Sequence, residues 1–227
     1  MKLAAFSDLH SNIYALEAML AEGADVDQWV SLGDCAGLLP GVNAVLDLIR
    51  TRRILAISGN HETALLSGMA LPHSVTGTDA LERQRAAISD ANREFVAGLP
   101  ETLQWECGGR TVRAVHTLDV AAGPDAKYRV DLAVLAEQFR GADIVLFGDT
   151  HLPLLCHCRD FLLVNPGSCG FPVDVTRRGS FAVIETDDLS CELRRVDYDV
   201  TPLLDDLTQA GYDVRLREFM RTGTWER

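Results

Sequence analysis

The chain has 227 residues, of which 47% are hydrophobic and 24% charged, a composition that excludes collagen, coiled coils and bulk disorder. Its 33 acidic and 21 basic residues give a net charge of -12, so it has no basic surface of the kind that binds a long nucleic acid. At this length we expect a single domain over residues 1–227.

The start of the chain gives no sign of secretion or membrane insertion. Its first apolar run, residues 2–6, is too short for the core of a signal peptide, and no later run approaches a membrane span. The 6 cysteines, without a secretion signal, favour free thiols over a disulfide framework. We therefore expect a cytoplasmic protein.

Strand-like apolar runs alternate with helical patterns in the N-terminal part of the chain. In the first helical pattern, Ile13, Leu16 and Leu20 recur at helical spacing. Repeated strand–helix units predict a parallel sheet with right-handed crossovers. In chain order, the predicted strands and helices alternate over residues 2–6, 12–21, 28–32, 42–50, 54–58 and 62–66.

The pattern changes after a polar segment that predicts one long helix over residues 78–99. Beyond it strands dominate, and Gly108 and Gly109 separate two short strands as a hairpin turn does. A Thr cap followed by Pro202 predicts one or two helices between Thr201 and Met220. The other predicted elements are a helix over 132–139 and strands over 103–107, 111–115, 144–147, 154–158, 161–164, 181–185 and 191–196.

Polar side chains with metal-binding groups come directly after the predicted strands. In open α/β sheets ligands bind beyond the carboxyl ends of strands, so we expect these side chains to converge. They supply carboxylates, imidazoles and one amide oxygen, a mixture that suits Mn²⁺, Fe, Zn²⁺ or a mixed pair and requires no thiolate. The candidates are Asp8, His10, Asp34, Asn60, His61, His116, Asp149 and His151.

These side chains suit a site for two metal ions. Two ions roughly 3.5–4 Å apart can clamp a phosphoryl group and generate hydroxide at neutral pH. Asp34 is the best candidate for a bridging carboxylate, because it follows the middle strand of the predicted units. Taken singly, such residues are often ordinary turn and capping residues. Their order along the chain favours a site.

The ordered motifs Asp8-Leu9-His10, Gly33-Asp34, Gly59-Asn60-His61-Glu62 and Gly148-Asp149-Thr150-His151, with segments 31–40, 164–168 and 198–200, cover most of the chain. In these motifs the sequence resembles the calcineurin-like metallophosphoesterases, in particular their small bacterial and archaeal phosphodiesterase branch. The resemblance implies an α/β (α+β) fold in which a two-sheet β-sandwich is flanked by helices. It also implies a dinuclear metal site and hydrolysis of phosphate esters.

The same resemblance implies which residues bind each metal ion. Position 149 departs from the family pattern Gly-His-x-His, because Asp149 stands where an imidazole normally ligates. A carboxylate is shorter and harder than an imidazole and adds negative charge, so it favours Mn²⁺ or weakens the second site. The implied ligands are Asp8, His10, Asp34 and His151 for one ion, and Asp34, Asn60, His116 and Asp149 for the other.

Two further departures lie near the expected substrate mouth. Thr117 follows His116 where relatives commonly have Gly, and Leu38 and Leu39 replace a more usual Tyr-Gly. We expect both changes to reshape the entrance for substrate.

His61 has a separate implied role beside Asn60. The resemblance makes it the donor of a hydrogen bond or proton to the leaving alkoxide, while metal-activated hydroxide attacks phosphorus in line. Glu62 either orients His61 or caps the next helix, and the cap is favoured.

The expected function is a metal-dependent phosphodiesterase acting on a small phosphate ester, with two divalent ions, Mn²⁺ first and Fe, Zn²⁺ or a mixed pair as alternatives. A phosphomonoesterase, such as a protein or nucleotide phosphatase, is one alternative, and a non-catalytic binding scaffold of the same fold is another. We expect no long nucleic acid and no membrane as partner, and a homo-oligomer is possible because relatives often form dimers or tetramers.

The motif Cys156-His157-Cys158 suggests a zinc site. Strand alternation, however, puts both thiols on one face of a strand and favours a role in packing.

Overall fold

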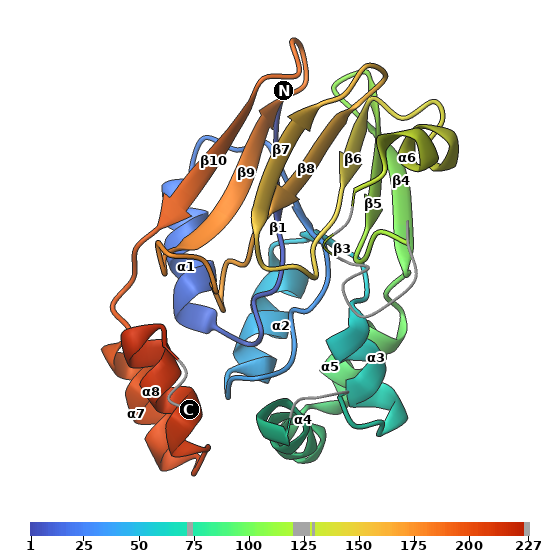
Figure 1. Ribbon diagram of the computed structural model, residues 1–227. Coiled ribbons are helices and arrows are strands. Elements are labelled where there is room, and N and C mark those ends of the chain that lie inside the picture. The colour runs from blue at the N-terminus through green and yellow to red at the C-terminus, as the bar shows by residue number, and fades with distance from the viewer. Residues whose placement is uncertain (72–74, 120–127, 129, 225–227) are drawn as a thin grey trace.

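Two five-stranded sheets form the centre of the computed structural model, which describes residues 1–71, 75–119, 128 and 130–224 (Figure 1). The strand order of the first sheet is β10-β9-β1-β2-β3. Its strands are β1 (Lys2–Phe6), β2 (Gln28–Ser31), β3 (Leu55–Ala56), β9 (Gly179–Glu185) and β10 (Cys191–Val196).

The first three strands of this sheet follow the predicted strand–helix alternation. β1 pairs parallel with β2, and β2 pairs parallel with β3, which confirms the parallel sheet expected from the sequence. β9 joins the other edge of β1 antiparallel, and β10 pairs antiparallel with β9. The connecting helices are α1 (Ile13–Glu22), α2 (Val42–Thr51) and α3 (Asn60–Ser67).

The second sheet has the order β4-β5-β6-β8-β7. Its central strands β5, β6 and β8 are parallel, while β4 and β7 pair antiparallel at the edges. The predicted hairpin is present between β4 and β5, where Gly108 (φ 55°) and Gly109 (φ 77°) both have the positive φ of a tight hairpin turn. The strands are β4 (Thr102–Cys107), β5 (Arg110–Val115), β6 (Ile144–Leu146), β7 (Pro153–His157) and β8 (Leu162–Pro166).

The two sheets pack face to face and are covered by helices on their outer faces. Leu3 and Val30 from the first sheet are fully buried in one apolar cluster with Ile144 and Leu162 from the second. α1 and α2 pack on the outer face of the first sheet, and α6 (Leu132–Gln138) packs on the second (Figure 1). The structure thus confirms the predicted two-sheet sandwich flanked by helices.

The predicted helix over residues 78–99 is wrong as a single element. The structure has two helices, α4 (Val75–Ala87) and α5 (Asp90–Ala97). Ser89 breaks the run because its backbone is extended (φ -66°, ψ 153°) and its side chain accepts a hydrogen bond from the Asn92 amide at 3.2 Å. A serine that caps a new helix stabilises a break that a helical pattern alone does not reveal.

The C-terminal segment forms two helices, α7 (Thr201–Gln209) and α8 (Val214–Thr222). Pro202 lies in the first turn of α7, as expected, and the Asp213 side chain caps α8 by accepting from the Arg215 amide at 2.8 Å. In Figure 1 this hairpin lies below β10.

All cysteines of the chain are free, as the sequence predicted. The Sγ atoms of Cys156 and Cys158 lie 3.5 Å apart, and His157 between them is exposed, in agreement with the packing interpretation. Among the described residues, no helix is long and apolar enough to span a membrane.

Candidate metal centre

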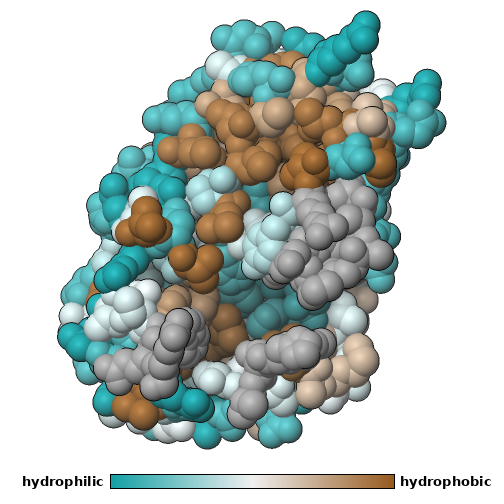
Figure 2. Space-filling model, in the orientation of Figure 1, coloured by the Kyte–Doolittle hydropathy of each residue, from teal (hydrophilic) through white to brown (hydrophobic). Residues whose placement is uncertain are grey.

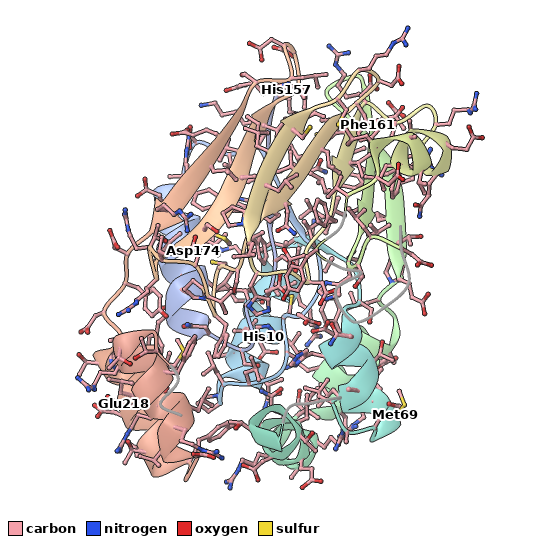
Figure 3. All side chains as sticks on the ribbon, viewed as in Figure 1. His10, Met69, His157, Phe161, Asp174 and Glu218 are labelled. Carbon is pink, nitrogen blue, oxygen red and sulfur yellow. The ribbon has the colours of Figure 1, made fainter. Side chains whose placement is uncertain are left out.

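The predicted site residues come together where the parallel strands of both sheets end. Asp8 follows β1, Asp34 follows β2 and Asn60 begins α3 after β3, whereas His116 follows β5 and His151 follows β6. Figure 3 places His10 below the two sheets, between the α7–α8 hairpin and α3, and Figure 2 shows this face hollowed near its centre. The convergence expected from the sequence is therefore observed.

The loops that carry the candidate metal ligands, here called the ligand loops, have left-handed backbone at residues other than glycine. Asp8 (φ 55°), His10 (φ 48°), Asp34 (φ 53°), Asp149 (φ 63°) and His151 (φ 58°) all lie in this region. Such backbone costs about 1–3 kcal/mol per residue and persists where surrounding structure enforces it, often at functional sites. Here it marks each ligand loop as it turns away from its strand.

Asp8, His10 and His151 form the first group of ligand atoms, all within 4.8 Å of one another. Nε2 of His151 lies 3.4 Å from Oδ1 of Asp8 and 3.1 Å from Nε2 of His10. Asp8 is fully buried, and neither of its carboxylate oxygens has a hydrogen-bond partner among the described residues. A buried carboxylate is costly unless it is paired or coordinates a metal, so this donor set fits a divalent ion.

Asp34 belongs to the two other groups, one with His10 and His61 and one with Asp8 and His116. Its Oδ2 lies 3.8 Å from Nε2 of His61 and 4.0 Å from Nε2 of His10, and its Oδ1 lies 3.5 Å from Nε2 of His116. Its two oxygens thus face different histidines. This is the position that a bridging carboxylate requires.

The amide oxygen of Asn60 completes the side of the site around His116. Nε2 of His116 lies 3.0 Å from Oδ1 of Asn60, and Nδ1 donates to the Leu32 carbonyl at 2.7 Å. The carbonyl of Leu32 fixes the ring so that Nε2 faces the site.

Burial and mutual contact shift the pKa values of these groups strongly. Burial raises the pKa of Asp8 and lowers the pKa of His10 well below its usual value. Burial alone would raise the pKa of Asp34, but nearby His116 and His61 hold it well below its usual value. Burial alone would lower the pKa of His116, but Asp34 overrides this and raises it to about 10. Such concentrated shifts are typical of functional sites.

His61 lies at the edge of the same cluster. Its backbone amide donates to Oδ1 of Asp34 at 2.9 Å, and its ring meets His10 edge-on with 4.5 Å between centroids. Its Nδ1 is buried without a hydrogen-bond partner among the described residues. The side chain is therefore held beside the candidate ligands.

Glu62 caps α3, as expected, and also joins two ligand loops. Its carboxylate accepts from the Gly59 amide, and also from the amides of Asp34 and Ala36, each at 2.8 Å. Gly59 leaves no room for a side chain, because a Cβ there would lie 2.1 Å from Oδ1 of Asp34. The motif Gly59-Asn60-His61-Glu62 thus fixes the position of Asp34.

Asp149 lies outside the three groups of ligand atoms within the described part of the chain. It is half-buried, and Oγ1 of Thr117 donates to its Oδ2 at 3.2 Å. Two of the residues that depart from the family pattern, Thr117 and Asp149, therefore contact each other. A metal-binding role for Asp149 stays a prediction.

Gln84 of α4 supports the site, although nothing in the sequence indicates this role. It is buried, its Nε2 donates to Oγ of Ser11 at 3.0 Å and to the Leu39 carbonyl at 2.6 Å, and its Oε1 accepts from the Gly37 amide at 2.8 Å. A single glutamine on a polar helix is ordinarily solvated. Only the tertiary structure shows that it holds the loop after Asp34.

Comparison with known proteins agrees with this geometry. A family model described as the calcineurin-like phosphoesterase superfamily domain matches residues 1–189. Uncharacterized protein MJ0912 of Methanocaldococcus jannaschii is 27% identical over 216 residues, which cover 87% of this chain and 88% of that protein.

Two solved structures share the fold over nearly the whole chain. A metallophosphoesterase from Sphaerobacter thermophilus has a TM-score of 0.79 at 24% identity, covering 99% of each chain. Hypothetical protein PH1004 from Pyrococcus horikoshii OT3 has a TM-score of 0.83 at 19% identity, covering 96% of this chain and 97% of that one. At these identities the structures establish the shared fold.

Proposed function

Because the chain belongs to the calcineurin-like phosphoesterase superfamily, we propose that this metallophosphoesterase is a phosphodiesterase acting on a small phosphate ester. The observation that carries the proposal is the buried carboxylate of Asp8, whose oxygens have no hydrogen-bond partner among the described residues while His10 and His151 face it. Such a group is stable when it coordinates a cation.

The proposed ligand sets share Asp34. When bound, two divalent ions supply positive charge for the phosphoryl oxygens and lower the pKa of coordinated water. Mn²⁺ is the proposed metal, because carboxylate and amide oxygens suit this ion and the proposed ligands include no thiolate. The first ion would be held by Asp8, His10, Asp34 and His151, and the second by Asp34, Asn60, His116 and Asp149.

His61 is proposed to donate a hydrogen bond or proton to the leaving oxygen of the ester. Burial lowers the pKa of His61, and an imidazole in its neutral form still offers one N–H. Its amide bond to Asp34 holds it next to the ligand loop. A donor placed there stabilises the alkoxide that leaves phosphorus.

The charge of the protein supports a diester over a monoester. A phosphate monoester carries close to two negative charges at pH 7, whereas a diester carries one. A net charge of -12 repels a dianion more strongly than a monoanion. The same charge disfavours long nucleic acid and is compatible with a compact ester.

The test is a hydrolysis assay of Mn²⁺-loaded protein on an aryl phosphodiester and on the matching monoester. We expect a larger kcat/KM for the diester, and loss of turnover in Asp34→Asn, which keeps the shape of the bridging side chain and removes its charge. A larger kcat/KM for the monoester would instead make the protein a phosphomonoesterase. No turnover with Mn²⁺, Fe²⁺ or Zn²⁺ would favour a binding scaffold.

A cytoplasmic setting is part of the proposal. The free cysteines of the chain suit a reducing compartment.

A further inference from the structure

The α7–α8 hairpin packs against the candidate metal centre, although it lies beyond residue 189, where the family match ends. It shares an apolar cluster with Leu39, from the loop after Asp34, and with Phe171, from the loop before β9. The hairpin side chains buried in this cluster are Leu203, Leu207, Leu216 and Phe219.

This packing accounts for one departure from the family pattern. Leu38 and Leu39 stand where relatives commonly have Tyr-Gly, and Leu39 is fully buried beneath the hairpin, with Leu38 packed against the same cluster. The two leucines therefore form part of the surface that receives α7 and α8.

Polar contacts hold the hairpin in place on two sides. The hydroxyl of Tyr14 on α1 donates to Oδ2 of Asp206 at 2.7 Å. Nη1 of Arg83 on α4 donates to the carbonyl of Ala210, at the end of α7, at 3.0 Å. The hairpin is thus fixed to the helices around the site.

Phe219 of α8 contacts the ligands through one intermediate residue. Its ring stacks on Phe171 with 4.7 Å between centroids and an interplanar angle of 25°. The Phe171 ring also meets His151 and His10 edge-on, with centroid distances of 6.1 Å and 5.9 Å. Phe171 therefore lies between α8 and two proposed ligands.

The backbone of Phe171 fixes the orientation of His151. Nδ1 of His151 lies 2.8 Å from the Phe171 carbonyl, which only accepts hydrogen bonds, so Nδ1 carries the hydrogen. Nε2, the other ring nitrogen, then lies on the side of Asp8, 3.4 Å from its Oδ1. A shift of Phe171 would turn His151 out of this position.

We propose that Phe219 is a positioning residue for the metal ligand His151 and acts through Phe171. The inference rests on the proposed metal-dependent function. According to this inference, α8, which lies outside the family match, holds one proposed metal ligand in place.

The test measures Mn²⁺ binding by full-length Phe219→Ala, using isothermal titration and the electron paramagnetic resonance of free Mn²⁺. Residues that orient metal ligands typically change affinity by ~10–100-fold, and we expect a loss in this range for one ion. Phe219→Tyr, which keeps the stacked ring, should bind Mn²⁺ like the wild type. His151→Ala marks the complete loss of that ligand.

Phe161→Ala is the matched control. It removes a ring of equal size and similar burial from the cluster under α6, which Figure 3 shows at the far end of the molecule from His10. Its Mn²⁺ affinity should be unchanged. Phe219→Leu, which keeps apolar volume but removes the stack, replaces Phe219→Ala if circular dichroism shows that the alanine variant is unfolded.

A second readout follows the His151 ring in metal-free protein. Its Nδ1–H resonance in a nitrogen-15 spectrum should exchange with solvent faster in the Phe219 variants than in Phe161→Ala. Unchanged Mn²⁺ affinity in Phe219→Ala and Phe219→Leu, or an equal loss in Phe161→Ala, would overturn the inference. Failure of the wild type to bind any of Mn²⁺, Fe²⁺ and Zn²⁺ would instead refute the proposed function.

Discussion

Nε2 of His61 lies 3.8 Å from Oδ2 of Asp34, and His61 belongs to one group of potential ligand atoms with His10. An experiment therefore has to separate a catalytic role of His61 from metal binding. We predict that His61→Ala lowers kcat by roughly 10²–10⁴-fold, because it removes the donor to the leaving oxygen. Metal content, measured by atomic emission on the same sample, should stay at the wild-type value. Loss of one ion would show that His61 is a ligand or a structural support of the site.

Metal binding at His116 should depend on pH. Because Asp34 raises the pKa of His116 to about 10 against the effect of burial, the ring is protonated at neutral pH in metal-free protein. An ion that uses Nε2 has to displace this proton, so its affinity should rise ~10-fold per pH unit and level off near pH 10. Isothermal titration in two buffers of different ionisation enthalpy should report release of at least one proton at pH 7.5. Buffer-independent heats would contradict the assignment.

The residues that converge at the candidate metal centre were predictable from the sequence, whereas their supporting contacts were not. Asp8 and Asp34 each follow an apolar strand, and local sequence alone exposes that pattern. Gln84 and Phe219 are ordinary helix residues that reach the site only through tertiary packing. No periodicity or motif distinguishes such residues from solvated or core positions.

At the scale of elements, the start of α3 fixes the position of Asp34 in the candidate metal centre. Gly59→Ala should displace Asp34, since the added Cβ would lie 2.1 Å from its Oδ1, and should weaken Mn²⁺ binding at least ~10-fold. The measurement is Mn²⁺ titration of the folded variant.

Gly68→Ala provides a control on the same helix. Gly68 has a left-handed backbone (φ 76°) and no atom within 4 Å of an added Cβ, so this change costs about 1 kcal/mol of stability and leaves metal affinity unchanged. Equal Mn²⁺ affinity in the two variants would show that Gly59 does not position Asp34.

Most elements of the fold were predicted because strand and helix patterns alternate cleanly and end at Gly, Asp or Asn. The segment over residues 78–99 was predicted wrongly as one helix, because a serine is tolerated within a helix and only its extended backbone reveals a cap. The pairing of β9 with β1 was also hidden, since strands so far apart in sequence meet through tertiary structure.

For the whole molecule, we expect the buried carboxylates to make the stability of the fold depend on bound metal. A ligand present at about 100 times its Kd stabilises the native state by about 2.7 kcal/mol. For a chain of this size, removing the metal with a chelator should therefore lower Tm by about 5–10 °C, measured by differential scanning calorimetry. Asp34→Asn should show little further change on chelation, and an unchanged wild-type Tm would argue against ion binding in the buried site.

The two sheets and the helices around them bring ligands from both halves of the chain to one place, and this convergence is what supports a two-metal phosphoesterase. The most direct test is anomalous scattering from crystals of the protein grown with Mn²⁺. We predict two peaks roughly 3.5–4 Å apart, one beside Asp8, His10 and His151 and one beside Asn60 and His116, with Asp34 between them. A single peak, or none, at these side chains would contradict the two-metal site.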